Sequence, residues 1–344
     1  MIMNKQAAEV RPPSPAVPRD AATVVVLREA DAGLQVLLLQ RAERGDHNSG
    51  AWVFPGGLVD AADRVRGEAA FRHAALRECF EECGILLARS AAGAWPVWTD
   101  AQRAELAALR PQVAAGQVAI ETVCQRFGVQ PAYGSLHFIA HWLTPMGRAK
   151  RFDTRFFVTV VPAAEQALHD AGETTDHVWM SVAEALSPDH ARRLMTPTRA
   201  TLEALRPFVS AAALQAWAAQ PRQVPCILPR LALDAAGLRP VLPGEPAHDE
   251  IALLDPEGHC QAWCVLRPGV AVPLSPRLTR ITGEGGRHRY WIDGAEVDGT
   301  APLLVAGDRI VVEGDDGHVP DALLAQADWI APRRGFVRRV NPTA

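Results

Sequence analysis

The sequence contains little cysteine and lacks any long apolar run. Its six cysteines among 344 residues are too few for a disulfide framework, and no two of them form the CxxC pair typical of a structural zinc site. The chain nowhere reaches the roughly 18 consecutive apolar residues of a membrane-spanning helix, and its N-terminus lacks the apolar core of a secretion signal. These absences predict a cytoplasmic protein with no membrane partner.

An excess of positive charge is also missing. The chain has 35 Lys and Arg residues against 39 Asp and Glu residues, which gives a net charge of −4. Proteins held on nucleic acid neutralise its phosphates with a basic excess, so nucleic acid is not an expected partner. The hydrophobic fraction of 48% is large enough for a sizeable core and excludes global disorder.

The length and the distribution of proline predict two domains. At roughly 100 to 200 residues per domain, a chain of 344 residues is too long for a single small module. Residues 1–20 carry four prolines without an apolar rhythm and are predicted to form a flexible tail, whereas six prolines within 221–246 predict a linker. The linker separates a first domain, 21–220, from a smaller β-rich domain at 247–344 that has no catalytic cluster.

Within the first domain, strand-like and helix-like segments follow one another. Residues 23–30, 34–41 and 51–57 have strand composition, which predicts a sheet that begins with a hairpin. Residues 68–83 contain no Gly or Pro and are followed by Gly84, which predicts a helix that ends there. Two amphipathic helices are predicted at 100–128 as an insertion, after which the sheet resumes.

Three glutamates crowd the end of the predicted helix at 68–83. Glu78, Glu81 and Glu82 lie at i, i+3 and i+4, so they share one side of the helix. Each like-charge pair at this spacing costs about 0.2–0.5 kcal/mol, and the negative end of the helix dipole adds to the penalty. Either the glutamates form a solvated acidic face, or a hard divalent cation such as Mg²⁺ or Mn²⁺ compensates them. Their surroundings favour the cation.

Those surroundings are FPGG at 54–57 and RECFEECGI at 77–85. With these motifs the chain resembles the Nudix hydrolase superfamily, whose box reads G-x5-E-x7-R-E-U-x-E-E-x-G-U, where U is a bulky apolar residue. The second half matches at every fixed position if Cys79 counts as apolar. In the first half the loop is six residues longer than in the box, and either Asp63 or Glu68 replaces the first glutamate.

The resemblance implies an α/β/α sandwich with a mixed sheet and a metal-dependent hydrolase. It implies that divalent ions are bound by three carboxylates and one carbonyl, those of Glu78, Glu81, Glu82 and Gly57. Arg77 would orient a glutamate. Glu78 is the first candidate for the general base, and Glu173, on another loop, is the second. A bound divalent ion neutralises phosphate oxygens and lowers the pKa of water, while a carboxylate accepts the proton, so a diphosphate bond can be hydrolysed.

Segments outside the box indicate the substrate class. The pattern LLLQR at 37–41 keeps the spacing to FPGG seen in coenzyme A pyrophosphatases. Four stretches are similar to the peroxisomal-type acyl-CoA diphosphatase branch and its bacterial relatives, namely residues 53–63, 77–89, 151–157 and 194–205. The resemblance implies that CoA or an acyl-CoA is cleaved to 3′,5′-ADP and (acyl-)phosphopantetheine.

Three arginines are candidates for phosphate contacts, because guanidinium groups match phosphate oxygens: Arg41, Arg151 and Arg155. Residues 151–157 could instead be an edge strand with alternating Arg and aromatic faces. The helical insertion at 100–128 could cap an acyl chain or serve packing alone. Two other functions stay open: a Nudix hydrolase of ADP-ribose or another nucleoside diphosphate derivative, and a non-catalytic Nudix ligand sensor.

Overall fold

The computed structural model of the protein describes residues 16–31, 33–42, 49–145, 148, 150–168, 174–190 and 192–234, and then 237–331 with several gaps. Two compact units make up the chain. Pro18–Trp142 and Phe152–Cys226 form one unit, and Met1–Val17, Leu143–Arg151 and Ile227–Ala344 are assigned to the other.

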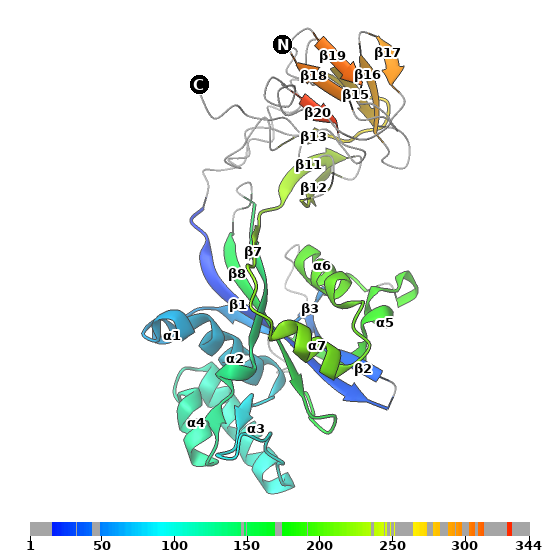
Figure 1. Ribbon diagram of the computed structural model, residues 1–344. Helices are drawn as coiled ribbons and strands as arrows, with labels where there is room; N and C mark the ends of the chain where they lie inside the picture. Colours follow the sequence, from blue (N-terminus) through cyan, green and yellow to red (C-terminus); the bar gives the residue numbers. More distant parts are fainter. Residues whose placement is uncertain are drawn as a thin grey trace. The chain divides into compact units, whose positions relative to one another are not determined.

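An eight-stranded mixed sheet organises the first unit (Figure 1). Its strands are β1 (Arg19–Ala30), β2 (Gly33–Arg41), β3 (Trp52–Val53), β4 (Gly56–Leu58), β7 (His137–Leu143), β8 (Phe152–Val161), β9 (Thr174–Ser181) and β10 (Cys226–Ile227). The order is β10-β7-β8-β1-β2-β3, with β4 paired to β1 and β9 paired to β2. β1 runs antiparallel to β2 and parallel to β8, as a mixed sheet requires.

Helices cover both faces of this sheet. One side carries α1 (Ala61–Arg64), α2 (Ala70–Cys83), α3 (Asp100–Ala114) and α4 (Ile120–Arg126), and the other carries α5 (Val182–Leu186), α6 (Thr196–Leu205) and α7 (Ala211–Ala218) (Figure 1). The valines and the leucine of β1 at 24–27 are fully buried, as is typical of a strand covered on both faces. The predicted α/β/α sandwich is thereby confirmed.

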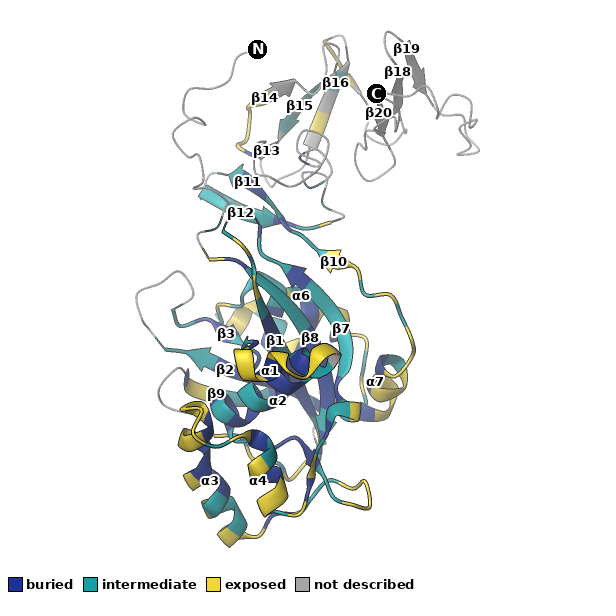
Figure 2. Ribbon diagram, turned by 90° about the vertical axis from the view of Figure 1, so that its left-hand side faces the viewer, coloured by how far each residue is buried: buried dark blue, intermediate teal, exposed yellow. Residues whose placement is uncertain are grey.

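The main core lies between the sheet and α2. Ala74, Leu76, Cys79 and Phe80 of α2 pack with buried residues of β1 and β2, and Figure 2 shows this burial together with the exposed outer faces of α3 and α4. α2 is preceded by a short 3₁₀ turn, η2 (Gly67–Ala69), and it ends at Gly84, whose φ of 72° is left-handed. The helix and its C-terminal end are therefore as predicted.

The two helices predicted for the insertion are also present. Pro111 lies inside α3, and the chain turns at Gly116, which has a φ of 68°. Two short strands, β5 (Ala88–Arg89) and β6 (Gln130–Pro131), pair with each other on either side of the insertion. A 3₁₀ turn, η3 (Tyr133–Ser135), then leads to β7, and a second, η4 (Pro188–His190), follows α5.

The C-terminal part is β-rich, as expected. Three small sheets contain β11 (Arg230–Asp234), β12 (Gly237–Val241) and β13 (Cys264–Val265); β14 (Ala271–Pro273), β15 (Leu278–Thr282), β16 (His288–Ile292) and β17 (Ala295–Val297); and β18 (Leu303–Ala306), β19 (Arg309–Val312) and β20 (Trp329–Ala331). In the described part of the chain, every helix is too short or too polar to cross a bilayer.

The segment at 221–246, predicted to be a linker, contains the strands β10, β11 and β12. Two of its prolines show how the segment accommodates these strands. Pro229 separates β10 from β11, and Pro240 belongs to β12, the edge strand of its sheet. A high density of prolines therefore does not by itself distinguish a linker from a segment that contains short strands.

Candidate active site

The acidic end of α2 lies directly against the glycines of β4. A Cβ atom on Gly57 would stand 2.4 Å from Glu78 Oε1, so only a glycine lets the carboxylate approach the strand this closely. The neighbouring Gly56 donates its backbone N–H to Glu82 Oε2 at 2.8 Å. Glu82 is buried, with 7% of its surface exposed. The FPGG motif and the acidic helix therefore form one site.

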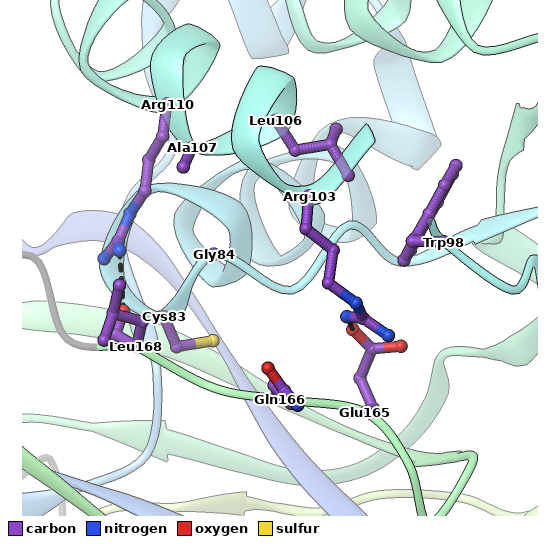
Figure 3. A pocket seen from close by; sticks show the side chains of 10 residues that line it. All are labelled: Cys83, Gly84, Trp98, Arg103, Leu106, Ala107, Arg110, Glu165, Gln166 and Leu168. Atoms are coloured by element: carbon purple, nitrogen blue, oxygen red, sulfur yellow. Dashed lines mark hydrogen bonds and ion pairs between the residues drawn. The ribbon is translucent and has the colours of Figure 1, made fainter. Parts of the chain in front are cut away.

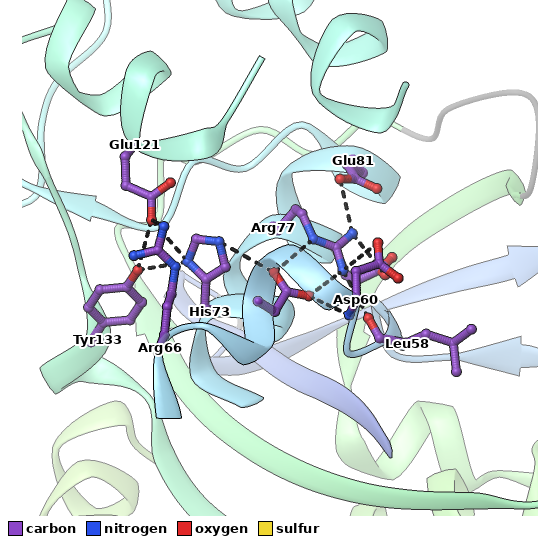
Figure 4. Close-up of polar contacts among 10 residues, drawn as sticks. Leu58, Asp60, Arg66, His73, Arg77, Glu81, Glu121 and Tyr133 are labelled. Atoms are coloured by element: carbon purple, nitrogen blue, oxygen red, sulfur yellow. Dashed lines mark hydrogen bonds and ion pairs between the residues drawn. The ribbon is translucent and has the colours of Figure 1, made fainter. Parts of the chain in front are cut away.

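Arg77 joins the carboxylates of α2 to the preceding loop (Figure 4). Its Nη1 donates to Glu78 Oε1 and to Glu81 Oε1, both at 3.1 Å. Its Nη2 donates to the Leu58 carbonyl at 2.9 Å and to Asp63 Oδ2 at 3.0 Å. One guanidinium thus fixes the acidic helix face relative to β4 and α1.

Asp63, one of the two candidates for the first acidic residue of the box, contacts Arg77. It lies in α1 and is 1% exposed. Besides the Arg77 contacts, its Oδ2 accepts the backbone N–H of Asp60 at 2.8 Å, which caps α1. Asp63 forms an ion pair with Arg77 at 3.0 Å, and the side chain of Glu68 lies outside the described residues. The longer loop therefore keeps an acidic partner for Arg77.

A buried polar network extends from Asp63 into the insertion. His73 Nε2 lies 3.4 Å from Asp63 Oδ1, and His73 Nδ1 lies 2.8 Å from the Tyr133 hydroxyl and 3.2 Å from Glu121 Oε1. Burial lowers the pKa of His73, although Glu121 acts in the opposite direction. Arg66 pairs with Glu121 at 2.5 Å and completes the network. Sequence reasoning missed these residues; the available signal was that His73 and Arg77 are spaced i, i+4 on one helix.

Negative charge is in excess around Arg77. Four carboxylates lie within 4 Å of this guanidinium, those of Asp60, Asp63, Glu78 and Glu81. Burial raises the pKa of Glu78 to about 7 against the lowering effect of Arg77, and burial also raises the pKa of Glu81. These carboxylates are therefore only partly compensated by the protein.

The donor set fits a hard divalent cation in its chemistry. Carboxylate oxygens and the Gly57 backbone, which a larger side chain would block, are the kind of ligands that Mg²⁺ and Mn²⁺ prefer. Within the described ranges, however, no three His, Cys, Asp or Glu side chains are already gathered as a metal-binding group. Glu78 and Glu81 are turned to Arg77, and Glu82 is turned to the Gly56 amide.

The three arginines predicted to contact phosphate lie in different places. Arg155 of β8 is in register with Ala22, which is opposite Gly57, so Arg155 lies on the sheet row of the acidic site. Its guanidinium stacks on Phe71 of α2, with Cζ 3.8 Å from the ring centre.

β8 lies between β7 and β1, so the edge-strand interpretation of residues 151–157 is wrong.

The other two arginines lie at strand ends, Arg41 as the last residue of β2 and Arg151 just before β8. Arg41 ends β2 beside an irregularity in its pairing with β9. Arg151 belongs to the other compact unit, is 6% exposed, and donates to the carbonyls of Thr144 and Ala16, both at 3.0 Å. Glu173, the second candidate for the base, lies outside the described residues.

Comparison with known proteins agrees with this geometry. Residues 17–104 match the NUDIX domain family and residues 63–198 match the NUDT19 Nudix domain family. Acyl-coenzyme A diphosphatase NUDT19 of Gallus gallus is 31% identical over 208 residues, which cover 44% of this chain and 55% of that protein. The Homo sapiens protein of the same name is 28% identical over 281 residues, covering 63% of this chain and 73% of that protein.

A solved structure agrees as well. The NUDIX hydrolase from Alicyclobacillus acidocaldarius is 26% identical, has a TM-score of 0.50, and is matched over 58% of this chain and 96% of its own. The chain spans little more than half the length of the Gallus gallus relative. The family matches, the fold and the box residues gathered around Gly57 together show that this chain belongs to the Nudix hydrolase superfamily.

Proposed function

We propose that this protein is a divalent-metal-dependent diphosphatase that cleaves CoA or an acyl-CoA to 3′,5′-ADP and (acyl-)phosphopantetheine. The observation that carries the hydrolase proposal is the excess of carboxylates around Arg77 at the box glycines. The substrate class rests on the similarity to proteins named acyl-coenzyme A diphosphatase. The free thiols of Cys79, Cys83, Cys124 and Cys226 support a reducing compartment such as the cytoplasm.

Mg²⁺ or Mn²⁺ would be held by the carboxylates of Glu78, Glu81 and Glu82 with the Gly57 carbonyl. When bound, such an ion neutralises phosphate oxygens and makes water more acidic. The excess negative charge around Arg77 supports this assignment, because a cation relieves the repulsion that a single guanidinium leaves.

Glu78 is the proposed general base. Its carboxylate lies at the box glycines, and a carboxylate held there can accept a proton from water. In the reaction, the oxygen of water bonds to phosphorus, the bond from that phosphorus to the bridging oxygen breaks, and the water proton passes to Glu78. Arg77 orients Glu78 and Glu81 for this step through its two 3.1 Å hydrogen bonds. Glu173 is the second candidate for the base.

Arg41, Arg151 and Arg155 are the proposed phosphate contacts, and their settings rank them. Arg155 is the strongest, because it shares a sheet row with Gly57. Arg151 is the weakest, because its buried guanidinium already donates to two backbone carbonyls. A buried donor seldom leaves such partners without a cost in free energy.

The test is mass spectrometry of the products from CoA, an acyl-CoA, ADP-ribose and NADH with Mg²⁺ and with Mn²⁺. The proposal expects 3′,5′-ADP and (acyl-)phosphopantetheine, with the highest kcat/KM for a CoA compound. A higher kcat/KM for ADP-ribose would instead support the nucleoside diphosphate alternative.

The sensor alternative is tested with Glu81→Gln. This variant should lose turnover if the protein is an enzyme, whereas a sensor would show no turnover in the wild type and would keep its ligand binding in the variant. The pairing of Asp63 with Arg77 supports the enzyme, because an acidic residue of the first half of the box contacts the arginine.

A further inference from the structure

The last turn of α2 concentrates negative charge that its own sequence does not balance. The final carbonyls of a helix have no partner inside it, and they form the negative end of the helix dipole. Glu81 and Glu82 lie in the same turn, and no basic residue does. Gly84 N–H donates to the Phe80 carbonyl at 2.9 Å and satisfies one of these groups. Others are satisfied by distant segments.

Arg110 of the inserted helix α3 binds one of these carbonyls. Its Nε donates to the Glu81 carbonyl at 2.7 Å, and its Nη1 donates to the Leu168 carbonyl at 2.6 Å (Figure 3). Leu168 in turn donates its own N–H to the Cys83 carbonyl at 2.9 Å. Arg110 is 9% exposed. One buried guanidinium thus links the end of α2, the inserted helix α3 and the segment that follows β8.

A pocket that opens to solvent separates parts of α2 and α3 at this junction. A cavity of about 130 Å³ lies between the end of α2 and α3, lined among others by Cys83, Trp98, Leu106 and Glu165. Side chains that interdigitate without gaps would hold the two helices at one separation. Beside a cavity, the hydrogen bonds of Arg110 contribute more to the position of the last turn of α2.

We infer that Arg110 is a positioning residue for Glu81 and Glu82, an inference that rests on the proposed function of these glutamates. It acts through the backbone of Glu81, because its guanidinium reaches the carbonyl of that residue. The planar fork of arginine reaches two carbonyls at once, whereas the ammonium of lysine is a single point of charge. The insertion would then hold the catalytic helix in place.

Charge and position predict opposite effects on metal binding. If Arg110 acted only as a nearby positive charge, its removal would strengthen the binding of a cation to the glutamates. If it positions the last turn of α2, its removal weakens that binding, because supporting residues behind metal ligands orient them. The affinity for Mn²⁺ therefore separates the two roles.

The experiment compares Arg110→Met and Arg110→Lys with the matched control Arg103→Met. Arg103 lies two turns earlier on α3 and lines the same cavity, but its ion pair with Glu165 is loose at 4.0 Å. Free Mn²⁺ is followed by electron paramagnetic resonance, kcat and KM are measured with CoA, and folding is checked by thermal unfolding. Arg110→Met should raise the Kd for Mn²⁺ about tenfold and lower kcat at saturating metal by a similar factor.

Arg110→Lys should recover less than half of the loss in Mn²⁺ affinity and in kcat, compared on a logarithmic scale. For Arg103→Met, both the Kd for Mn²⁺ and kcat should stay within about twofold of the wild type. An unchanged or lower Kd in Arg110→Met overturns the inference. If Arg110→Met does not fold, a wild-type Kd in Arg110→Lys overturns it instead. A wild type that neither binds Mn²⁺ nor hydrolyses CoA overturns the proposed function itself, whereas an active wild type with normal Arg110 variants overturns this inference alone.

Discussion

The two sides of the Arg77 guanidinium differ in how fully their carboxylates are satisfied. On one side, Asp63 is 1% exposed, pairs with Arg77 and accepts the Asp60 amide. On the other side, Glu78 and Glu81 have side chains 14% exposed and share a single nitrogen of Arg77. Both sides are acidic, yet only the first has its charge met by several fixed donors.

From this contrast we propose a structural role for Asp63 and a chemical role for Glu78 and Glu81. A buried carboxylate with several fixed donors stabilises the fold and has no need of another cation. A buried carboxylate that shares one guanidinium nitrogen with a second carboxylate keeps affinity for a proton or a metal ion. In agreement with this, burial raises the pKa of Glu78 to about 7. The Nudix box prescribes acids on both sides of the arginine, and the hydrogen bonds assign them different roles.

Glu78→Gln should produce the largest effect. Removal of the proposed base is expected to lower kcat for CoA about 10³-fold, in line with general base catalysis. Stability should be unchanged or higher, because a buried and poorly compensated charge is removed. Steady-state kinetics and urea unfolding measure the two quantities. Activity within about tenfold of the wild type would assign the proton transfer to another group.

Asp63→Asn should act mainly on stability. The amide leaves Arg77 with one buried anion fewer, which is expected to cost roughly 3 kcal/mol in the free energy of unfolding. Asp63→Glu is the matched control, since it retains the charge. Urea unfolding of both variants gives the comparison. If Asp63→Asn lost activity while its free energy of unfolding stayed unchanged, Asp63 would have a chemical role like that proposed for Glu78 and Glu81.

Local patterns in the sequence predict the elements that carry the site. The continuous apolar runs of β1 and β2, the Gly- and Pro-free run of α2 and the stop at Gly84 are properties of neighbouring residues. The crowding of Glu78 and Glu81 is also visible in the sequence, because a helix fixes the spacing of its own side chains. The box residues could therefore be assigned before the fold was known.

Contacts between distant segments could not be predicted in this way. His73 and Tyr133 are 60 positions apart, and Arg110 and Leu168 are 58 apart. No periodicity in the sequence relates such pairs, since their approach depends on how the insertion packs on α2. The choice of Asp63 as the partner of Arg77 has the same origin, because it depends on the path of a loop longer than the box allows.

A smaller effect is expected from pH in the metal-free protein. Burial raises the pKa of Glu78 from 4.5 to about 7, so the folded state holds a proton that the unfolded state releases between these values. The contribution of Glu78 to stability therefore falls as pH rises from 4.5 to about 7, by on the order of 3 kcal/mol, and then levels off.

Urea unfolding across this pH range, in EDTA, measures the effect as the difference between the wild type and Glu78→Gln. Added Mg²⁺ should restore stability more at pH 8 than at pH 5, because it binds the ionised carboxylates. A flat difference between the two proteins would show that the carboxylate of Glu78 is as well compensated as that of Asp63.

Tyr133→Phe should have the smallest of these effects. It tests whether the network from Asp63 through His73 to Tyr133 serves stability alone. The variant removes the hydroxyl 2.8 Å from His73 Nδ1, which is expected to cost about 1 kcal/mol of stability. Its kcat should stay within about twofold of the wild type, because His73, Asp63 and Arg77 separate Tyr133 from Glu78 and the bonds of Arg77 remain. Arg126→Ala is the control: its partner Glu105 is exposed, so its loss should cost less than about 0.5 kcal/mol. A kcat for Tyr133→Phe that falls well beyond this twofold range would mean that the network also positions the glutamates, and the two sides of Arg77 would then act as one unit.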